Sequence, residues 1–433
     1  MSKISPRHST TMPIVPMKTA FKSLQGNERR FHVMAKPGGA KCNIDCQYCF
    51  YLHKENLLHQ PKQPKMDDET LELFIKSYIE SQDGEQIVFS WQGGEPTLLG
   101  LDYFRKVVKL QKKYQPEGIR IENDLQTNGI LLNDEWCEFL HVNNFLVGLS
   151  IDGPQELHDK YRKTRSGKPT FHLVMKAVEK LQQRQVRFNA LVTVNRHNVK
   201  YPLEIYRFLT RDLGVTYIQL APVVEPNDFH TTAPQFWNEQ MIPELGSELA
   251  KPGHPMSVVT DWSVDPDDWG EFLSTMFVEW VNNDLGQVLV NLFETAVAQV
   301  MEKPSQLCIT AEFCGKGLAI EHNGDVYSCD HYVYPEYKLS NIHDQTLNEM
   351  VFSTRQFTFG MAKRDSLPEY CKQCPYLKYC WGECPKNRLI MTPDGEQGLN
   401  YLCSGIRRFF DDTLPMLVGL SQILQKQNSK YQV

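Results

Sequence analysis

The chain has 433 residues and a formal net charge of −6, with 41% apolar and 23% charged residues. This composition is typical of a globular protein rather than a disordered or fibrous one, and the length predicts more than one domain. The mild negative charge, without Lys/Arg-rich runs, argues against nucleic-acid binding. No apolar run approaches the roughly 18 residues that a membrane-spanning helix needs, so we expect no membrane association.

The N-terminal segment, residues 1–29, contains Pro6, Pro13 and Pro16 but no continuous apolar run. A secretory signal requires an apolar core, so we interpret this segment as a poorly ordered, non-secretory leader. The rest of the chain divides by pattern into residues 30–225, a connecting segment at 226–303 and a cysteine-rich segment at 304–433.

Between residues 30 and 225, apolar β-type runs alternate with helical patterns. Strands are predicted at residues 31–35, 86–91, 120–126, 146–151, 188–194 and 217–221. The helices predicted between them include residues 67–82, 101–114, 134–143, 170–184 and 202–213. This alternation is typical of a parallel sheet, and six βα units are fewer than the eight of a complete barrel. We therefore expect an α/β fold with a partial (β/α)6 barrel.

A Pro-rich and acidic segment at residues 222–268 interrupts the alternation. Two helices are predicted after it, at residues 269–283 and 291–301. The segment from residue 304 onward is dense in cysteine, and we expect it to hold little regular structure before a C-terminal helix.

The twelve cysteines indicate metal binding rather than disulfides. Disulfide scaffolds are normally short secreted chains with a higher density of cysteine, whereas eleven of these residues fall into two clusters with metal-type spacing. Cys137 stands alone in an apolar helical pattern, and we interpret it as a buried residue without chemistry. A reducing compartment, the cytoplasm, is the expected location.

The first cluster comprises Cys42, Cys46 and Cys49, in a Cys-x3-Cys-x2-Cys spacing. It directly follows the first predicted strand, and reactive residues in parallel α/β folds gather at the carboxyl ends of strands. Three thiolates can hold three corners of a 4Fe–4S cluster, which leaves the fourth iron open to a small molecule. Structural metal sites are normally closed by four protein ligands, so the spacing indicates chemistry.

A second motif, Gly93-Gly94-Glu95-Pro96, follows the second predicted strand. Its two glycines would let the backbone approach a ligand closely, and the Glu95 carboxylate could accept hydrogen bonds from an amine. The alternative is an ordinary turn between a strand and a helix.

The second cluster supplies eight further cysteines, enough for two fully ligated 4Fe–4S clusters. Structural zinc fits the spacing equally well, because tetrahedral sulfur sites suit both metals. Read locally, the spacing would place Cys371, Cys374, Cys380 and Cys384 on one metal.

Together, the first cluster and the Gly-Gly-Glu-Pro motif resemble a radical S-adenosylmethionine (SAM) enzyme, and the later cysteines resemble its SPASM extension. Their order and spacing are similar to those of the anaerobic sulfatase-maturating enzymes. The resemblance implies three 4Fe–4S clusters, of which Cys42, Cys46 and Cys49 hold the first. It places an auxiliary cluster on Cys308, Cys314, Cys329 and Cys384, and another on Cys371, Cys374, Cys380 and Cys403. It further implies SAM contacts at Tyr48, Gly94, Ser150, Arg162 and Leu220.

The activity implied by the resemblance is oxidation of a Cys or Ser of a sulfatase to Cα-formylglycine, started by a 5′-deoxyadenosyl radical. Asp330, which follows Cys329, would take the proton of the target side chain, with His331 as the rival base. A negatively charged cluster beside Asp330 should raise its pKa, as a general base requires. The implied partners are a sulfatase polypeptide and an electron donor such as flavodoxin or ferredoxin.

Three alternatives remain open at this point. A different SPASM-type maturase would form a thioether or carbon–carbon crosslink with nearly the same motifs. A non-enzymatic electron carrier would need a fourth ligand for the first cluster. A zinc-stabilised binding module would use the C-terminal cysteines structurally.

Overall fold

The structure is a computed structural model that describes residues 30–234 and 242–430. The leader predicted at residues 1–29 lies outside the described residues.

One sheet organises the described part of the chain, in the strand order β12-β11-β10-β1-β3-β4-β5-β7-β8-β9. Its central strands β1, β3, β4, β5, β7 and β8 are all parallel, as predicted for six βα units. These strands are β1 (His32–Lys36), β3 (Gln86–Trp91), β4 (Arg120–Thr127), β5 (Leu146–Ser150), β7 (Phe188–Val194) and β8 (Tyr217–Pro222). Each agrees with a predicted strand to within one residue at either end.

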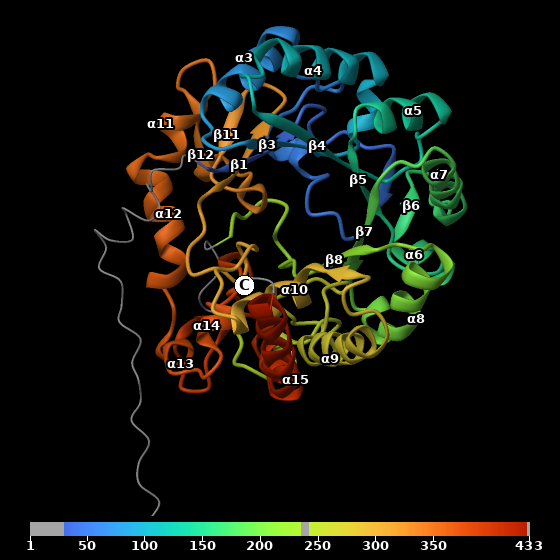
Figure 1. Ribbon diagram of the computed structural model, residues 1–433. Coiled ribbons are helices and arrows are strands. Elements are labelled where there is room, and N and C mark those ends of the chain that lie inside the picture. Colours follow the sequence, from blue (N-terminus) through green and yellow to red (C-terminus); the bar gives the residue numbers. More distant parts are fainter. Residues whose placement is uncertain (1–29, 235–241, 431–433) are drawn as a thin grey trace, which may run out of the picture.

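Helices lie along the outer side of the curved sheet, which gives the partial barrel seen in Figure 1. They are α3 (Asp68–Glu80), α4 (Leu101–Tyr114), α5 (Asp134–Val142), α6 (Gln155–Tyr161), α7 (Phe171–Gln183) and α8 (Pro202–Arg207). The helix predicted at 202–213 is divided, because a π-helical segment, Phe208–Asp212, continues α8. The short helix α6 was not predicted.

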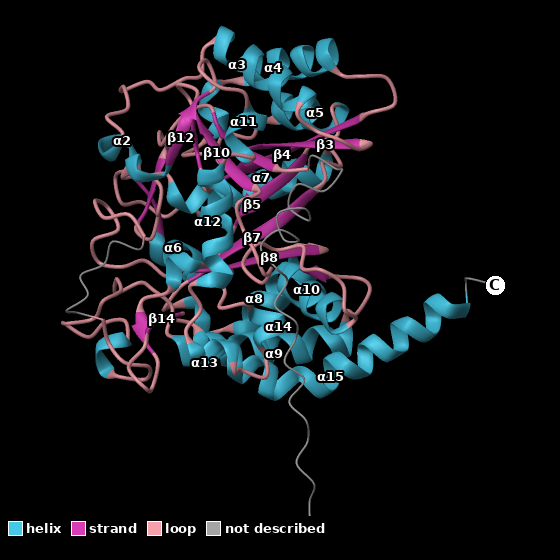
Figure 2. Cartoon of the chain, turned by 90° about the vertical axis from the view of Figure 1, so that its left-hand side faces the viewer, coloured by secondary structure: helices cyan, strands magenta, loops and turns pink. Residues whose placement is uncertain are grey.

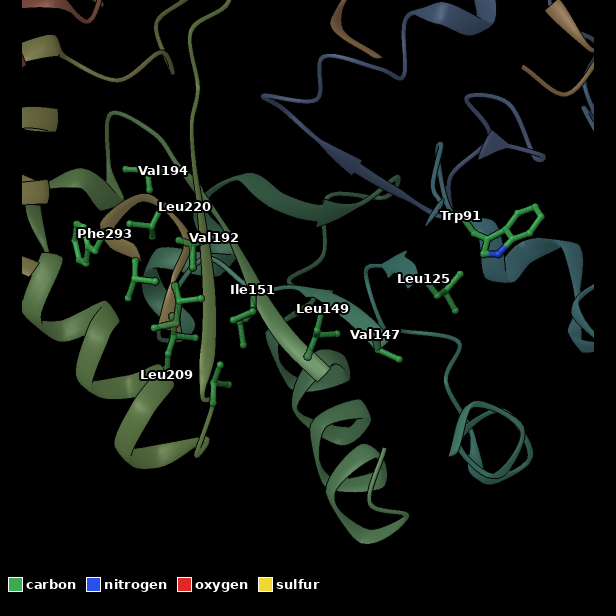
Figure 3. Close-up of a cluster of buried hydrophobic side chains, with 14 of the residues drawn as sticks. Trp91, Leu125, Val147, Leu149, Ile151, Val192, Val194, Leu209, Leu220 and Phe293 are labelled. Atoms are coloured by element: carbon green, nitrogen blue, oxygen red, sulfur yellow. The ribbon is translucent and has the colours of Figure 1, made fainter. Parts of the chain in front are cut away.

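The core lies between these helices and the sheet. Figure 3 shows apolar side chains from successive strands in one layer, among them Trp91, Leu149 and Val192. Burial of this surface against the helices is the main stabilising term for such a layer. Cys137 on α5 is fully buried in the same cluster, as predicted for a residue without chemistry.

The cysteine-rich segment extends the same sheet, so the expectation of little regular structure there was wrong. Strand β10 (Gly317–Glu321) pairs parallel with β1, and β11 (Asp325–Tyr327) and β12 (Lys338–Asn341) follow antiparallel. Without β10, the backbone edge of β1 would be unpaired. The pairing joins segments about 280 residues apart, which no local pattern in the sequence could indicate.

The remaining elements lie in the lower part and along the left-hand side of the molecule in Figure 1. They are β9 (Leu289–Val290), α9 (Pro266–Asn283), α10 (Asn291–Val300), α11 (Leu347–Val351), α12 (Thr354–Asp365), α13 (Glu369–Lys372), α14 (Leu377–Cys380), α15 (Cys403–Lys430) and the hairpin β13 (Ile390–Met391)–β14 (Gln397–Leu399). Near the cysteine loop lie α2 (Lys54–Leu57) and a short antiparallel pair, β2 (Ile44–Cys46) with β6 (Arg162–Thr164).

The C-terminal helix α15 packs along α9 and then projects from the body (Figure 2). The two helices approach closely at Gly405, where an added Cβ would lie 2.0 Å from the carbonyl oxygen of Pro266. Neither α15 nor any other helix of the described residues combines the length and apolar character that crossing a membrane requires.

Candidate active site

The cysteine loop is positioned from two sides. It leaves the carboxyl end of β1, and β2 at its centre pairs with β6, so that Cys46 faces Arg162 across the two strands. Burial raises the pKa of Cys42 to about 12, and burial also raises the pKa of Cys46 and of Cys49. Free thiols here keep their protons at neutral pH, so a bound metal has to displace them.

The Gly93–Gly94 turn is built against the cysteine loop. The Gly94 amide donates to the Gly39 carbonyl at 2.9 Å, and an added Cβ at Gly94 would lie only 2.1 Å from the Lys41 carbonyl oxygen. Gly93 has a φ of +122°, a conformation that favours glycine. No other residue fits at Gly94 without displacement of the backbone that leads into Cys42.

Glu95 is held mostly by neighbouring protein groups. Its buried carboxylate accepts hydrogen bonds at Oε1 from the Thr97 amide (3.1 Å), the Thr97 hydroxyl (2.6 Å) and the Thr127 hydroxyl (2.8 Å), and at Oε2 from the Asn128 amide (2.8 Å). A carboxylate oxygen can accept about two hydrogen bonds, so Oε2 keeps one position for a further donor such as an amine. Glu95 therefore ties the end of β3 to the end of β4, and Asn128 in turn reaches the Cys42 thiol at 3.8 Å.

Tyr48, Asp152 and Arg162 form a buried group beside Cys46. The Arg162 Nε donates to the Asp152 carboxylate at 3.0 Å, and the Tyr48 hydroxyl donates to the same carboxylate. The Arg162 Nη1 lies 3.9 Å from the Cys46 sulfur, and its guanidinium lies 5.6 Å from the Tyr48 ring centroid. Arg162 is 5% exposed, so it is no solvated surface residue. The group places a fixed positive charge next to the cysteine loop.

Ser150 is the last residue of β5, and Leu220 lies within β8. The Ser150 hydroxyl, at the end of β5, accepts a hydrogen bond from Gln126 at 2.9 Å. Leu220 is buried on β8 within the apolar cluster, with Val192 and Phe293 nearby in Figure 3. The structure thus assembles Tyr48 and Arg162 directly, whereas the Leu220 side chain belongs to the core.

Asp330 belongs to the cysteine-rich segment and lies at the carboxyl end of β1, at the opening that we call the barrel mouth. Its carboxylate lies 2.5 Å from the ammonium of Lys36, the last residue of β1, and both side chains are nearly buried. Burial alone would raise the pKa of Asp330, but the attraction of Lys36 and of other nearby cations lowers it below its ordinary value. The raised pKa expected from the sequence is therefore not observed in the protein alone. Lys36 links the proposed base to the strand that carries the cysteine loop.

A small pocket opens between the barrel and the cysteine-rich segment. It is lined by Phe50, Glu225, Pro226, Phe229, Thr232, Pro234, His331, Tyr334 and Lys386. Burial lowers the pKa of His331 to about 4, so at neutral pH its imidazole is uncharged. Asp330, the residue before His331, does not itself line the pocket.

Sequence reasoning missed several charged residues at this mouth. Glu321 on β10 accepts hydrogen bonds from the Tyr51 hydroxyl and, at 3.0 Å, from Gln60. Lys54 is 1% exposed and its ammonium lies 3.1 Å from the Tyr334 ring centroid. Their only sequence signal was a charged residue at the end of an apolar run, which is common and carries little information alone.

Four of the C-terminal cysteines line a single pocket. They are Cys371, Cys374, Cys380 and Cys403. Cys384 is not among them, although it is only four residues from Cys380. Trp381, Gly382 and Glu383 all have positive φ, between 49° and 66°, and this left-handed turn separates Cys384 from Cys380.

The other four cysteines interact with one another electrostatically. Burial and then repulsion from Cys308 and Cys384 raise the pKa of Cys329, and Cys308 likewise contributes to the raised pKa of Cys314. Cys371, Cys374, Cys380 and Cys403 thus share one pocket, whereas Cys384 interacts with Cys308 and Cys329, an arrangement compatible with the grouping that the family resemblance implies.

The donor set of both groups fits a 4Fe–4S cluster, since each offers four thiols. Cys308 is exposed, Cys371 is buried and the other six are half-buried. Among the described residues, no three His, Cys, Asp or Glu side chains converge on a point where they could hold a single ion.

Comparison with known proteins gives two family matches. The Radical SAM superfamily matches residues 37–209, and an iron-sulfur cluster-binding domain, SPASM, matches residues 308–375.

Relatives match over nearly the whole chain. A serine-type anaerobic sulfatase-maturating enzyme of Bacteroides thetaiotaomicron is 46% identical over 92% of this chain and 93% of its own. A cysteine-type enzyme of Clostridium perfringens is 31% identical over 90% of this chain and 98% of its own. Among solved structures, native anSMEcpe with bound AdoMet and Kp18Cys peptide matches with a TM-score of 0.77 and 30% identity, over 90% of this chain and 99% of that one. SuiB of Streptococcus suis, at 13% identity and a TM-score of 0.58, shares the fold.

Proposed function

The chain belongs to the anaerobic sulfatase-maturating enzymes, radical SAM proteins with a SPASM domain. We propose the roles that its residues have in the reaction of this family. The enzyme oxidises a Cys or Ser of a sulfatase to Cα-formylglycine. A SAM molecule at the first cluster supplies the 5′-deoxyadenosyl radical that removes a hydrogen from the target Cβ. The sulfatase-maturating relatives at 46% and 31% identity favour this activity over thioether or carbon–carbon crosslinking.

The residues proposed to hold SAM gather around the cysteine loop. Cys42, Cys46 and Cys49 hold the first cluster, and the buried Tyr48–Asp152–Arg162 group fixes a cation beside Cys46 for the carboxylate end of SAM. Gly94 keeps the loop in place, and Ser150 at the end of β5 is proposed to face the nucleoside. The contact proposed at Leu220 on β8 would come from its main chain, because its side chain lies in the core. The amine of SAM is proposed to bind the Gly93–Glu95 segment, where Glu95 Oε2 accepts only the Asn128 amide.

Asp330 is proposed as the general base, and its ion pair with Lys36 is the observation that carries this assignment. The pair holds a buried carboxylate at the end of β1, directly before the cysteine loop, and His331, the next residue, lines the pocket between the barrel and the cysteine-rich segment. A base in that position can take the thiol or hydroxyl proton of the target, while the radical acts on the adjacent carbon.

Two auxiliary clusters complete the proposal, on Cys308, Cys314, Cys329 and Cys384 and on Cys371, Cys374, Cys380 and Cys403. After hydrogen removal, the target loses one proton to the base and one electron. A Ser target then gives the aldehyde directly, whereas a Cys target gives a thioaldehyde, which water hydrolyses to the aldehyde with release of hydrogen sulfide. The auxiliary site near Asp330 is proposed to accept that electron. The domain boundaries that we propose are residues 30–225 for the barrel, 226–303 for the connecting segment and 304–433 for the SPASM domain. The proposed partners are a sulfatase peptide and a flavodoxin or ferredoxin in the cytoplasm, without nucleic acid or membrane.

The test is incubation of the anaerobically reconstituted protein with SAM, a reductant and matched Ser- and Cys-containing sulfatase peptides. Formylglycine is expected by mass spectrometry and by reaction of its aldehyde with a hydroxylamine. A peptide that loses two hydrogens but does not react with hydroxylamine would support a crosslinking maturase instead. Unchanged peptides alongside 5′-deoxyadenosine would refute the proposed substrate class.

A further inference from the structure

A buried lysine stands against the cysteine group that contains Cys308. Lys363 on α12 is 0% exposed, and its ammonium donates to the carbonyls of Cys308 (2.6 Å), Ile309 (2.7 Å) and Ala311 (2.5 Å). Its electrostatic partners include the thiols of Cys314, Cys384 and Cys308. No part of the mechanism above uses this residue.

The hydrogen bonds identify the charge state of Lys363. Three carbonyl oxygens lie within 2.7 Å of one nitrogen, and each accepts but cannot donate. A neutral amine has two N–H groups, whereas an ammonium has three. The three carbonyl contacts therefore fit an ammonium rather than a neutral amine, even though burial lowers the pKa of Lys363. This charge lies in the interior, beside the Cys308 group.

The same face of α12 offers a neutral counterpart. Gln356, Gly360 and Lys363 follow at helical spacing, and all three are buried against the segment between Cys308 and Gly315. Gln356 donates to the carbonyls of Gly315 (2.8 Å) and Ser328 (2.9 Å). A neutral donor such as the Gln356 amide is enough to hold the carbonyls of this segment in place. Hydrogen bonding alone therefore does not explain why a charged group is buried at Lys363.

A second cation lies between the two cysteine groups. Arg388 donates to the Lys363 carbonyl at 2.6 Å, and its electrostatic partners include Cys371 and Cys380 of one group and Cys384 of the other. Its Nε is buried without a hydrogen-bond partner. The Lys363 charge thus acts mainly on the Cys308 group, although Cys380 of the other group also interacts with it, and the Arg388 charge acts on both groups.

We propose that Lys363 and Arg388 raise the reduction potentials of the auxiliary clusters, Lys363 at the Cys308 group and Arg388 at both groups. This inference rests on the proposed function for the existence of those clusters. Reduction adds one negative charge to a cluster, and a nearby cation at low dielectric stabilises the reduced form more than the oxidised one. A cluster with a raised potential accepts the electron from the target radical more readily.

The experiment measures potentials rather than turnover. The full chain with Cys42, Cys46 and Cys49 replaced by Ala is reconstituted, so that only auxiliary clusters contribute, and a redox titration is followed by electron paramagnetic resonance. Lys363→Met removes the charge at similar size, and Lys363→Arg retains it. Gln356→Met, which removes two hydrogen bonds from the same helix face without a change in charge, is the matched control.

Lys363→Met is expected to shift the cluster of the Cys308 group to a more negative potential by more than the other cluster, whereas Lys363→Arg and Gln356→Met stay near the parent. Arg388→Met is expected to shift both clusters. Unchanged potentials in Lys363→Met and Arg388→Met, with iron content intact, would overturn the inference, as would an equal shift in Gln356→Met. Should Lys363→Met lose iron, Lys363→Gln, which keeps two donors without charge, is read in its place. Absence of auxiliary iron in the parent would refute the cluster assignment in the proposed function instead, a distinguishable result.

Discussion

Replacement of Asp330 by Asn tests the proposed base most directly. Asn cannot accept the target proton but keeps a similar shape and one acceptor oxygen. Loss of a general base costs on the order of 10²–10⁴ in rate. We therefore expect formylglycine production to fall by that factor, while cleavage of SAM to 5′-deoxyadenosine continues.

The Lys36–Asp330 ion pair adds a stability effect that has to be separated from catalysis. Lys36 is 1% exposed, so Asp330→Asn leaves its ammonium buried without a counter-ion. Removal of one partner of a buried pair typically costs about 3–5 kcal/mol, whereas replacement of both partners is often nearly neutral. The double variant Lys36→Met/Asp330→Asn should therefore recover most of the lost stability.

The assay quantifies 5′-deoxyadenosine and formylglycine peptide in parallel for each variant, with thermal unfolding measured on the same samples. His331→Ala is the comparison for the rival base. If the double variant regains both stability and product, Asp330 is structural and the reasoning fails. Near wild-type aldehyde from Asp330→Asn, with loss in His331→Ala, would assign the base to His331.

Three further predictions follow from the geometry of the sites. Replacement of Cys42, Cys46 and Cys49 by Ala should abolish 5′-deoxyadenosine formation while auxiliary iron remains, and persistent cleavage of SAM would refute the open-iron assignment. Gly94→Ala should displace the cysteine loop, because its Cβ would lie 2.1 Å from the Lys41 carbonyl oxygen; we expect loss of SAM cleavage with little change in auxiliary iron, and normal cleavage would contradict this. Metal analysis of anaerobically reconstituted protein should find about twelve irons per chain, and stoichiometric zinc with about four irons would be the contrary result.

The sequence by itself determined the features that depend on neighbouring residues. Strand and helix periodicity predicted the six parallel strands, because alternation of buried and exposed positions is a local property. The spacing of Cys42, Cys46 and Cys49 after the first strand was also local, and so was its resemblance to the radical SAM family. Burial of Cys137 followed from its apolar neighbours in the same helix.

Only the tertiary structure decided which distant groups meet. The pairing of β10 with β1 brings Asp330 to Lys36, residues that are almost 300 positions apart in the sequence. The left-handed turn after Cys380 separates it from Cys384, although spacing placed the two together. Local spacing limits which residues can be close, but long-range pairing and backbone direction select which of them are close. For that reason the cysteine motifs could be predicted from the sequence, whereas the ion pair at the proposed base and the buried Lys363 could not.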